Sequence, residues 1–155
     1  MVLQQWLVWL VLLWSVTLPC PAAVAPNSIA LVVNQNDPDS IATGQYYLTA
    51  RGIPPQNLFR INLPTQGQID AATFTTAKTQ LDAALPTHIQ FLALAWTQPF
   101  RVDCMGITAA FSLGFSPAFC ATGCTPTRPS PYFGSQSSAP FAEQGVRPSM
   151  LLAGS

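Results

Sequence analysis

Apolar and polar positions along the chain alternate between strand-like and helix-like patterns. Residues 28–33 (SIALVV) form a continuous apolar run rich in β-branched side chains, which is typical of a strand buried on both faces. Residues 58–63 (LFRINL) alternate apolar side chains onto one face, and residues 89–96 (IQFLALAW) are again almost entirely apolar. These patterns predict three strands. A fourth apolar segment, SMLLA at 149–153, indicates the beginning of another strand.

The stretches between these segments predict helices. Asp37 followed by Pro38 is typical of an N-cap with proline at the first helical position. The helix that starts there extends to about residue 51, where Gly52 stands in the position of a C-terminal cap. Residues 70–85 place apolar side chains on one stripe at helical spacing, and a proline follows. The sequence therefore predicts two helices, one in each gap between the first three strands.

The order strand, helix, strand, helix, strand predicts the fold class. With right-handed crossovers it gives an α/β, three-layer parallel sheet, the Rossmann-like or flavodoxin-like half of a domain. Residues 103–148 break the pattern as a Cys/Pro-rich irregular excursion with a short helix at 105–113, which is either ordered or a lid. Because the fourth strand has no helix after it, we expect residues 26–155 to be the N-terminal part of one α/β domain, truncated after the start of that strand.

The N-terminus has the pattern of a signal peptide, residues 1–25. Its apolar core, residues 6–18, has a length within the roughly 7–15 residues of such cores and below the roughly 20 needed to span a bilayer. Ala-Val-Ala at 23–25 has the small-x-small form of a cleavage site, although no Lys or Arg precedes the core. We expect export to the periplasm or beyond, with no stable membrane span after cleavage. The alternative is a membrane anchor formed by an uncleaved N-terminal segment.

Composition excludes several classes of partner. Charged residues make up only 8% of the chain, and six basic residues balance six acidic ones. No basic face is therefore available for nucleic acid, which requires many cations to neutralise its phosphates. The chain also lacks a glycine-rich phosphate loop. We predict no cofactor, no nucleic acid, and either a small polar ligand or a protein partner.

Three cysteines follow the signal peptide. Cys104, Cys120 and Cys124 would meet an oxidising compartment after export, which favours a disulfide. Three cysteines allow three pairings, and each leaves one thiol over. A metal site is not expected, because the only histidine, His88, lies before the third strand and the cysteine spacing differs from that of zinc ribbons.

The expected position of a ligand site follows from the topology. Ligands of parallel α/β sheets bind at the carboxyl ends of the strands, where the strand order reverses. If the first and third strands are neighbours, that crevice lies between residues 34–37 and 96–101. The candidate ligand-binding residues there are Asn34, Asn36, Asp37, Ser40, Trp96, Gln98 and Arg101.

Each of these candidates also has a purely structural alternative. Asn, Asp and Ser after a strand serve equally well in turns and helix caps. Arg101 could pair with Asp103 or Asp37 instead of a ligand. Catalytic residues cannot be assigned, because Cys104 would need a base and His88 lies at the other end of the strand.

Several segments resemble one known group in order along the chain. They are VVNQNDPDSIATGQYYLTARGIPPQNLFRINLP, FLALAWTQPFRVDCMGITAAFSLGF, CATGCTPTRPSPYF and VRPSMLLA. Together they are similar to a family of exported bacterial proteins of unknown function, and the resemblance covers the chain from about residue 29 to its end. The resemblance implies export and an N-terminal fragment of a longer protein. It implies no reaction and no catalytic residues.

These observations favour an exported binding or surface-associated module without its own catalysis. Two alternatives remain open. The chain could be the N-terminal half of an exported hydrolase-like enzyme whose other catalytic groups lie beyond residue 155. It could also be an interaction scaffold that uses the cysteine-rich excursion, in which Arg128, Tyr132 and Phe133 are candidate surface contacts.

Overall fold

The structure is a computed structural model that describes residues 24–121 and 123–152. The predicted signal peptide and its alternative, an N-terminal membrane anchor, lie outside the described residues except for positions 24 and 25. Within the described part, none of the helices combines the length and the hydropathy that crossing a bilayer requires.

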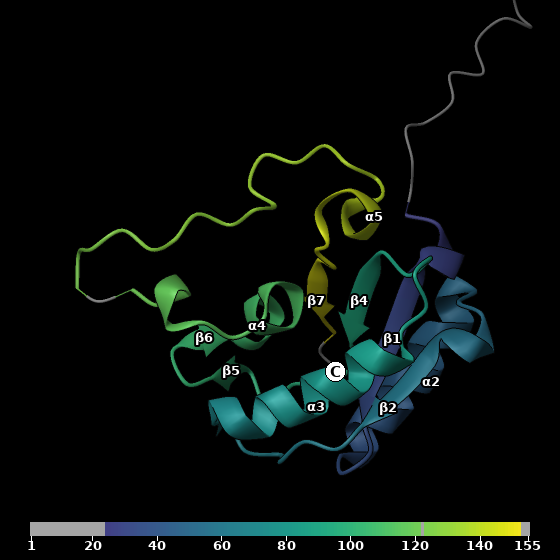
Figure 1. Cartoon of the computed structure of the whole chain (residues 1–155). Helices are drawn as coiled ribbons and strands as arrows, with labels where there is room; N and C mark the ends of the chain where they lie inside the picture. Colours follow the sequence, from purple (N-terminus) through teal and green to yellow (C-terminus); the bar gives the residue numbers. More distant parts are fainter. Residues whose placement is uncertain (1–23, 122, 153–155) are drawn as a thin grey trace, which may run out of the picture.

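The main sheet has four parallel strands, as the sequence predicts (Figure 1). Its order is β2-β1-β4-β7, with β1 at Ile29–Asn34, β2 at Leu58–Ile61, β4 at Phe91–Leu94 and β7 at Ser149–Leu151. All six residues of β1 are buried, because β1 pairs on both edges and is covered on both faces. The α/β parallel fold class is therefore confirmed, while truncation of the domain stays a prediction.

The two long helices begin and end at the residues that their capping signals indicate. Helix α2 spans Pro38–Arg51, with Asp37 accepting a hydrogen bond from the backbone N–H of Asp39 and Gly52 in the left-handed conformation at φ 61°. Helix α3 spans Ala71–Ala84. These caps satisfy terminal backbone groups that the helices leave unpaired.

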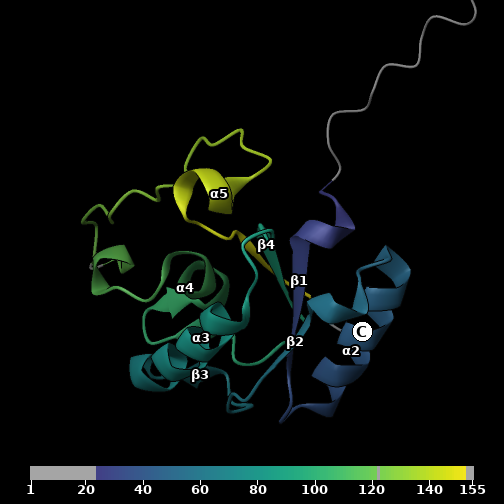
Figure 2. The same cartoon turned by 45° about the vertical axis from the view of Figure 1, so that its right-hand side comes forward.

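The helices lie in layers on the two faces of the sheet (Figure 2). Helix α2 covers one face, where Leu31, Val33 and Ala93 belong to one buried cluster. Helix α3 covers the other face together with α4, a shorter helix at Ile107–Leu113. Helix α2 approaches β1 closely at Gly44, where an added Cβ would overlap with Cγ1 of Val33.

Short regular elements that the sequence pattern did not indicate occur in the excursion after β4 and elsewhere in the described chain. A second sheet has the order β3-β5-β6, from strands Gln68–Ile69, Arg101–Val102 and Met105–Gly106. The other short elements are η1 at Pro26–Ser28, η2 at Pro55–Asn57, η3 at Pro117–Phe119 and α5 at Pro140–Gln144. The predicted helix at 105–113 begins two residues later than expected, because Met105 and Gly106 pair with β5 instead.

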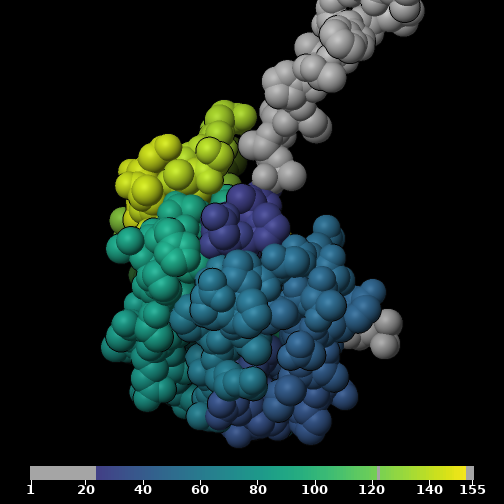
Figure 3. Space-filling view, turned by 90° about the vertical axis from the view of Figure 1, so that its right-hand side faces the viewer, coloured from purple at the N-terminus to yellow at the C-terminus, as the bar shows by residue number. Residues whose placement is uncertain are grey.

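The last part of the excursion, where the chain comes back to the sheet, is held by contacts at the end of the sheet where the strands begin. The side-chain oxygen of Gln90 accepts hydrogen bonds from the backbone N–H groups of Phe141 and Ala142, at 3.0 and 3.1 Å. The buried guanidinium of Arg147 donates to the carbonyl of Ile89 at 3.0 Å and lies 3.3 Å from the ring centroid of Phe141. Burial lowers the pKa of Arg147, and the charge of Asp82 opposes that shift. Figure 3 shows the yellow α5 segment at the same end of the molecule as the purple η1.

Candidate functional site

The strand order reverses between β1 and β4, which makes this pair the topological switch point of the sheet. The two strands are parallel neighbours, with Ile29 opposite Phe91 and Val32 opposite Leu94. The condition on which the sequence-based site depended is therefore met.

Asn34, at the carboxyl end of β1, is fully buried and its side chain bonds to the protein itself. Its Oδ1 accepts hydrogen bonds from the backbone N–H groups of Leu63 and Asn36, at 3.0 and 3.2 Å. Its Nδ2 donates to the carbonyl of Leu63 at 3.1 Å, and so does Nδ2 of Asn36. The hydroxyl of buried Ser40 accepts from the backbone N–H of Asn34 at 2.8 Å. These contacts join the end of β1 to the chain that follows β2.

Each of the four polar candidates after β1 has a partner within the protein itself. Asp37 bonds to the backbone N–H of Asp39 at 3.0 Å and caps α2. Asn34, Asn36 and Ser40 hold the turn before that helix. The turn and capping interpretation therefore accounts for their recorded contacts.

The candidates after β4 divide into one buried residue and two exposed ones. Trp96 is 2% exposed, and its Nε1 donates to the carbonyl of Pro99 at 3.1 Å. Its ring packs edge-on against Phe111, with centroids 5.9 Å apart, so Trp96 belongs to the core. Gln98 is exposed and precedes a cis peptide bond to Pro99. Arg101 is exposed at the start of β5.

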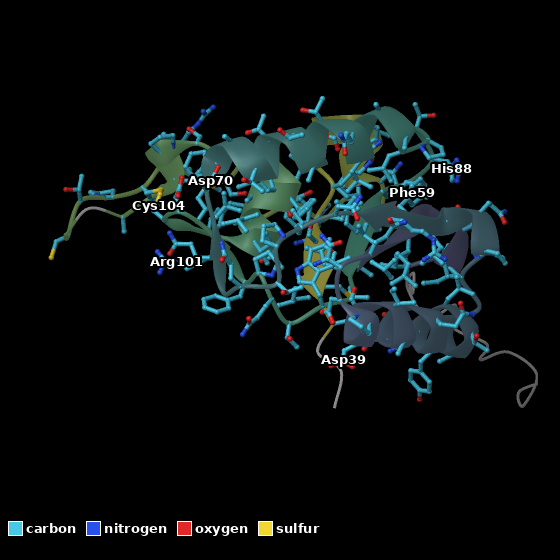
Figure 4. The ribbon with its side chains drawn as sticks, turned by 90° about the horizontal axis from the view of Figure 1, so that it is seen from below. Asp39, Phe59, Asp70, His88, Arg101 and Cys104 are labelled. Atoms are coloured by element: carbon cyan, nitrogen blue, oxygen red, sulfur yellow. A yellow bond between two sulfur atoms is a disulfide. The ribbon has the colours of Figure 1, made fainter. Side chains whose placement is uncertain are left out.

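Arg101 bonds to Asp103, as its structural alternative expects, but not as an ion pair. Nε of Arg101 donates instead to the backbone carbonyl of Asp103 at 2.8 Å. The carboxylate of Asp103 accepts from the backbone N–H of Ala71 at 3.1 Å, at the start of α3. Figure 4 shows Arg101 apart from Asp39, which lies at the start of α2.

A disulfide joins Cys104 to Cys120, with their Cα atoms 5.6 Å apart, and confirms the prediction of a disulfide. Of the three pairings that the sequence left open, this one links the β5–β6 turn to η3. Cys124 is exposed and carries a free thiol. His88 lies at the far end of the molecule from Cys104 in Figure 4. The part of the chain that the structure describes contains no group of three or more His, Cys, Asp or Glu side chains that could hold a metal ion.

A cleft that the sequence reasoning missed lies beside α4. We call it the α4 cleft; its volume is about 510 Å³. Its walls are α4, the disulfide region, η3 and residues 127–133, which we call the strap. The lining residues are Cys104, Met105, Gly106, Ala109, Leu113, Phe119, Thr127, Arg128, Pro129, Ser130 and Phe133.

The strap is held to η3 at one point near the cleft. The backbone N–H of Arg128 donates to the carbonyl of Ala118 at 2.9 Å. The guanidinium of the same residue lies 5.6 Å from the ring centroid of Phe119. A backbone bond and a cation–π contact therefore place Arg128 on the wall of the cleft.

A second cavity of about 360 Å³ lies next to the first along α4. It shares Ala109, Leu113 and Ser130 with the α4 cleft and extends toward β7 at Ser149. The hydroxyls of Ser112 and Ser149 are 3.1 Å apart on this side. Apolar and hydroxyl groups thus line both sides of the exposed face of α4.

None of the seven ligand-binding candidates from the sequence lines the α4 cleft, although Cys104 does, and so do Arg128 and Phe133, two of the candidate surface contacts of the scaffold alternative. The signal that could have indicated it is the set of aromatic side chains around Arg128 in an otherwise Pro/Ser-rich stretch. The sequence pattern alone does not show that this stretch folds back over α4.

Comparisons of the chain with protein-family models, with curated proteins and with solved structures found no match.

Proposed function

We propose that this chain is an exported binding module that takes a small molecule in the α4 cleft and has no catalytic function of its own. The observation that carries the proposal is the cleft itself. Its volume of about 510 Å³ falls within the roughly 300–1,000 Å³ typical of ligand pockets. Its lining is mainly apolar, with few polar side chains, which is also typical of such pockets.

The chemistry of the lining supports binding more than reaction. Its polar side chains are two hydroxyls, on Thr127 and Ser130, and the guanidinium of Arg128. Cys104 is consumed in the disulfide and offers no thiolate. General-base catalysis needs an imidazole, carboxylate or amine near the reacting group, and the lining residues include none of these.

Export is part of the same proposal, in a bacterium and to the periplasm or beyond. The disulfide between Cys104 and Cys120 supports it, because such bonds persist in oxidising compartments. The signal-peptide pattern at residues 1–25 points in the same direction.

A cleft-filling substitution tests the binding proposal. Gly106 lines the cleft, and a Cβ added there would meet no heavy atom within 4 Å. Gly106→Leu should therefore narrow the cleft, because its Cβ fits without overlap and its longer side chain occupies space there. Ala50→Leu, at an exposed position on α2, is the matched control.

The measurement is the fluorescence of a neutral apolar probe, N-phenylnaphthylamine, titrated with the full chain. We expect saturable binding to the wild type and to Ala50→Leu, and binding weakened at least about tenfold in Gly106→Leu, since each 1.4 kcal/mol lost is a factor of ten. Circular dichroism establishes that all three proteins are folded. A wild type that does not bind the probe, or a Gly106→Leu variant that binds it equally well, would overturn the proposal.

A further inference from the structure

We infer that the natural ligand of the α4 cleft is an amphipathic monocarboxylate, an aromatic or aliphatic acid whose carboxylate is held by Arg128. This inference depends on the proposed function, because it assigns a chemical class to the ligand of the same cleft. It adds a specific residue and a specific charge.

The residues that line the cleft carry positive charge and no negative charge. Arg128 is the only charged residue among those that line it. The ion pair recorded within the described residues joins Lys78 to Asp82, on α3, so Arg128 has no carboxylate partner in that part of the chain. A guanidinium offers parallel N–H donors that match the two oxygens of a carboxylate. A single cation suits a monoanion better than a phosphate, which normally receives several donors.

The position of the guanidinium is compatible with this role. Its Cζ lies over the ring of Phe119 at 5.6 Å from the ring centroid, within cation–π range, and no ion pair of Arg128 is recorded within the described residues. The backbone bond from Arg128 to Ala118 fixes the base of the side chain. A pre-placed donor loses less conformational freedom on binding than a mobile one.

The remaining wall explains the apolar part of the ligand. Met105, Ala109 and Leu113 present alkyl surface, and Phe119 and Phe133 present aromatic faces. Phe133 is 89% exposed, which leaves a large ring available for contact with a ligand at the rim. The neighbouring cavity of about 360 Å³ begins at Ala109 and Leu113 and gives room for a chain longer than the first cavity holds.

Arg101 provides a matched control, because it is also an exposed arginine in the same part of the molecule. Its Nε already donates to the carbonyl of Asp103, and it is not among the residues that line the α4 cleft. Arg101→Gln and Arg128→Gln therefore remove the same charge, one outside the cleft and one on its wall.

The experiment compares two fluorescent probes on the full chain: dansyl-labelled undecanoic acid and its uncharged primary amide. For wild type and Arg101→Gln, we expect the acid to bind more tightly than the amide, and added salt to weaken only the acid. For Arg128→Gln, affinity for the acid should fall about tenfold, the usual effect of removing a charge-assisted hydrogen bond. Affinity for the amide should stay the same.

The possible results distinguish failure of the carboxylate assignment from failure of the proposed function. If Gly106→Leu blocks both probes but Arg128→Gln and Arg101→Gln bind the acid alike, the cleft binds ligands and the carboxylate assignment is wrong. If Arg128→Gln weakens acid and amide equally, the residue acts through the shape of the wall, and the assignment is again wrong. If the wild type binds neither probe, the proposed function fails as well.

Discussion

Asn34 supplies the sharpest test of how the carboxyl edge of the sheet is built. It was a ligand candidate by sequence, yet its fully buried side chain makes three hydrogen bonds to the backbone of Leu63 and Asn36. We predict that Asn34→Ala destabilises the fold and leaves binding in the α4 cleft unchanged for the molecules that remain folded.

The size of the expected loss in stability follows from the backbone groups that would lose their hydrogen bond to Asn34. The N–H of Leu63 would lose a 3.0 Å bond in a buried environment, which costs about 1–3 kcal/mol. The carbonyl of Leu63 keeps the bond from Nδ2 of Asn36 and should contribute little. The N–H of Asn36 is only part-buried and can donate a hydrogen bond to water instead, so its loss costs about 0.5 kcal/mol. The expected loss is about 1.5–3.5 kcal/mol, a large fraction of the roughly 5–15 kcal/mol that stabilises a typical domain.

Urea denaturation followed by circular dichroism and by tryptophan fluorescence measures the free energy of unfolding. The matched control is Asn36→Ala, which removes one part-buried bond to a carbonyl that Asn34 also satisfies. We expect the control to lose no more than about 1 kcal/mol. A loss below about 1 kcal/mol in Asn34→Ala, or equal losses in the two variants, would refute the reasoning from buried partners.

Three further predictions concern other parts of the fold. Gly44→Ala should lower the free energy of unfolding by about 1–3 kcal/mol in the same assay, because the new Cβ overlaps with Val33 where α2 packs on β1. Replacing Cys104 and Cys120 together by serine should cost about 3 kcal/mol, the value expected for opening a loop with a sequence separation of 16 residues; peptide mapping without reduction should recover these two cysteines in one linked pair. Hydrogen bonds from Thr73 hold the pKa of Asp70 below its usual value. The stabilisation from that carboxylate is therefore present above the unfolded pKa of about 3.9 and is lost as the pH falls through the lower folded value, so acid titrations of unfolding should be less steep in Asp70→Asn.

Features with local causes were predictable from the sequence. Asp37 and Pro38 specify the start of α2 by themselves, and Gly52 specifies its end, because caps depend on residues within one turn of the helix. The parallel sheet was equally predictable, since continuous apolar strands separated by helical stretches allow few other topologies.

Features with distant partners were not predictable in the same way. The role of Asn34 depends on Leu63, which is 29 residues away along the chain. The burial of Trp96 depends on contact with Phe111 of α4 and on the turn that brings the carbonyl of Pro99 to its Nε1. A polar or aromatic side chain at the end of a strand has the same sequence signature whether it faces a ligand or its own backbone.

The α4 cleft lay further outside sequence reasoning, because its walls come from segments without periodicity. Gly106 and Arg128 are separated along the chain by α4 and η3, and they line the same cleft because the strap returns to η3, where the backbone N–H of Arg128 bonds to Ala118. The cysteine pattern showed that a cross-link was favoured but left three pairings open. The pairing of Cys104 with Cys120 joins the β5–β6 turn to the end of η3, and both segments belong to the wall of the cleft.

Parallel α/β sheets usually bind ligands at the switch point, where the edge of the sheet is also closed. In this chain the polar groups at the switch point close the edge of the sheet, and the proposed ligand site is the α4 cleft. At the switch point, the chain after β2 bonds to Asn34 and Asn36, so the amides that could hold a ligand secure the edge of the sheet instead. At the cleft, Arg128 stands on an excursion whose strap adds little to the buried core, and its charge has no recorded acidic partner. Substitution of a polar group that stabilises the fold should change the free energy of unfolding, and substitution of a polar group that binds a ligand should change the affinity. Asn34→Ala should change unfolding alone and Arg128→Gln should change acid binding alone, and a variant that moved both quantities together would show that the two regions act as one site.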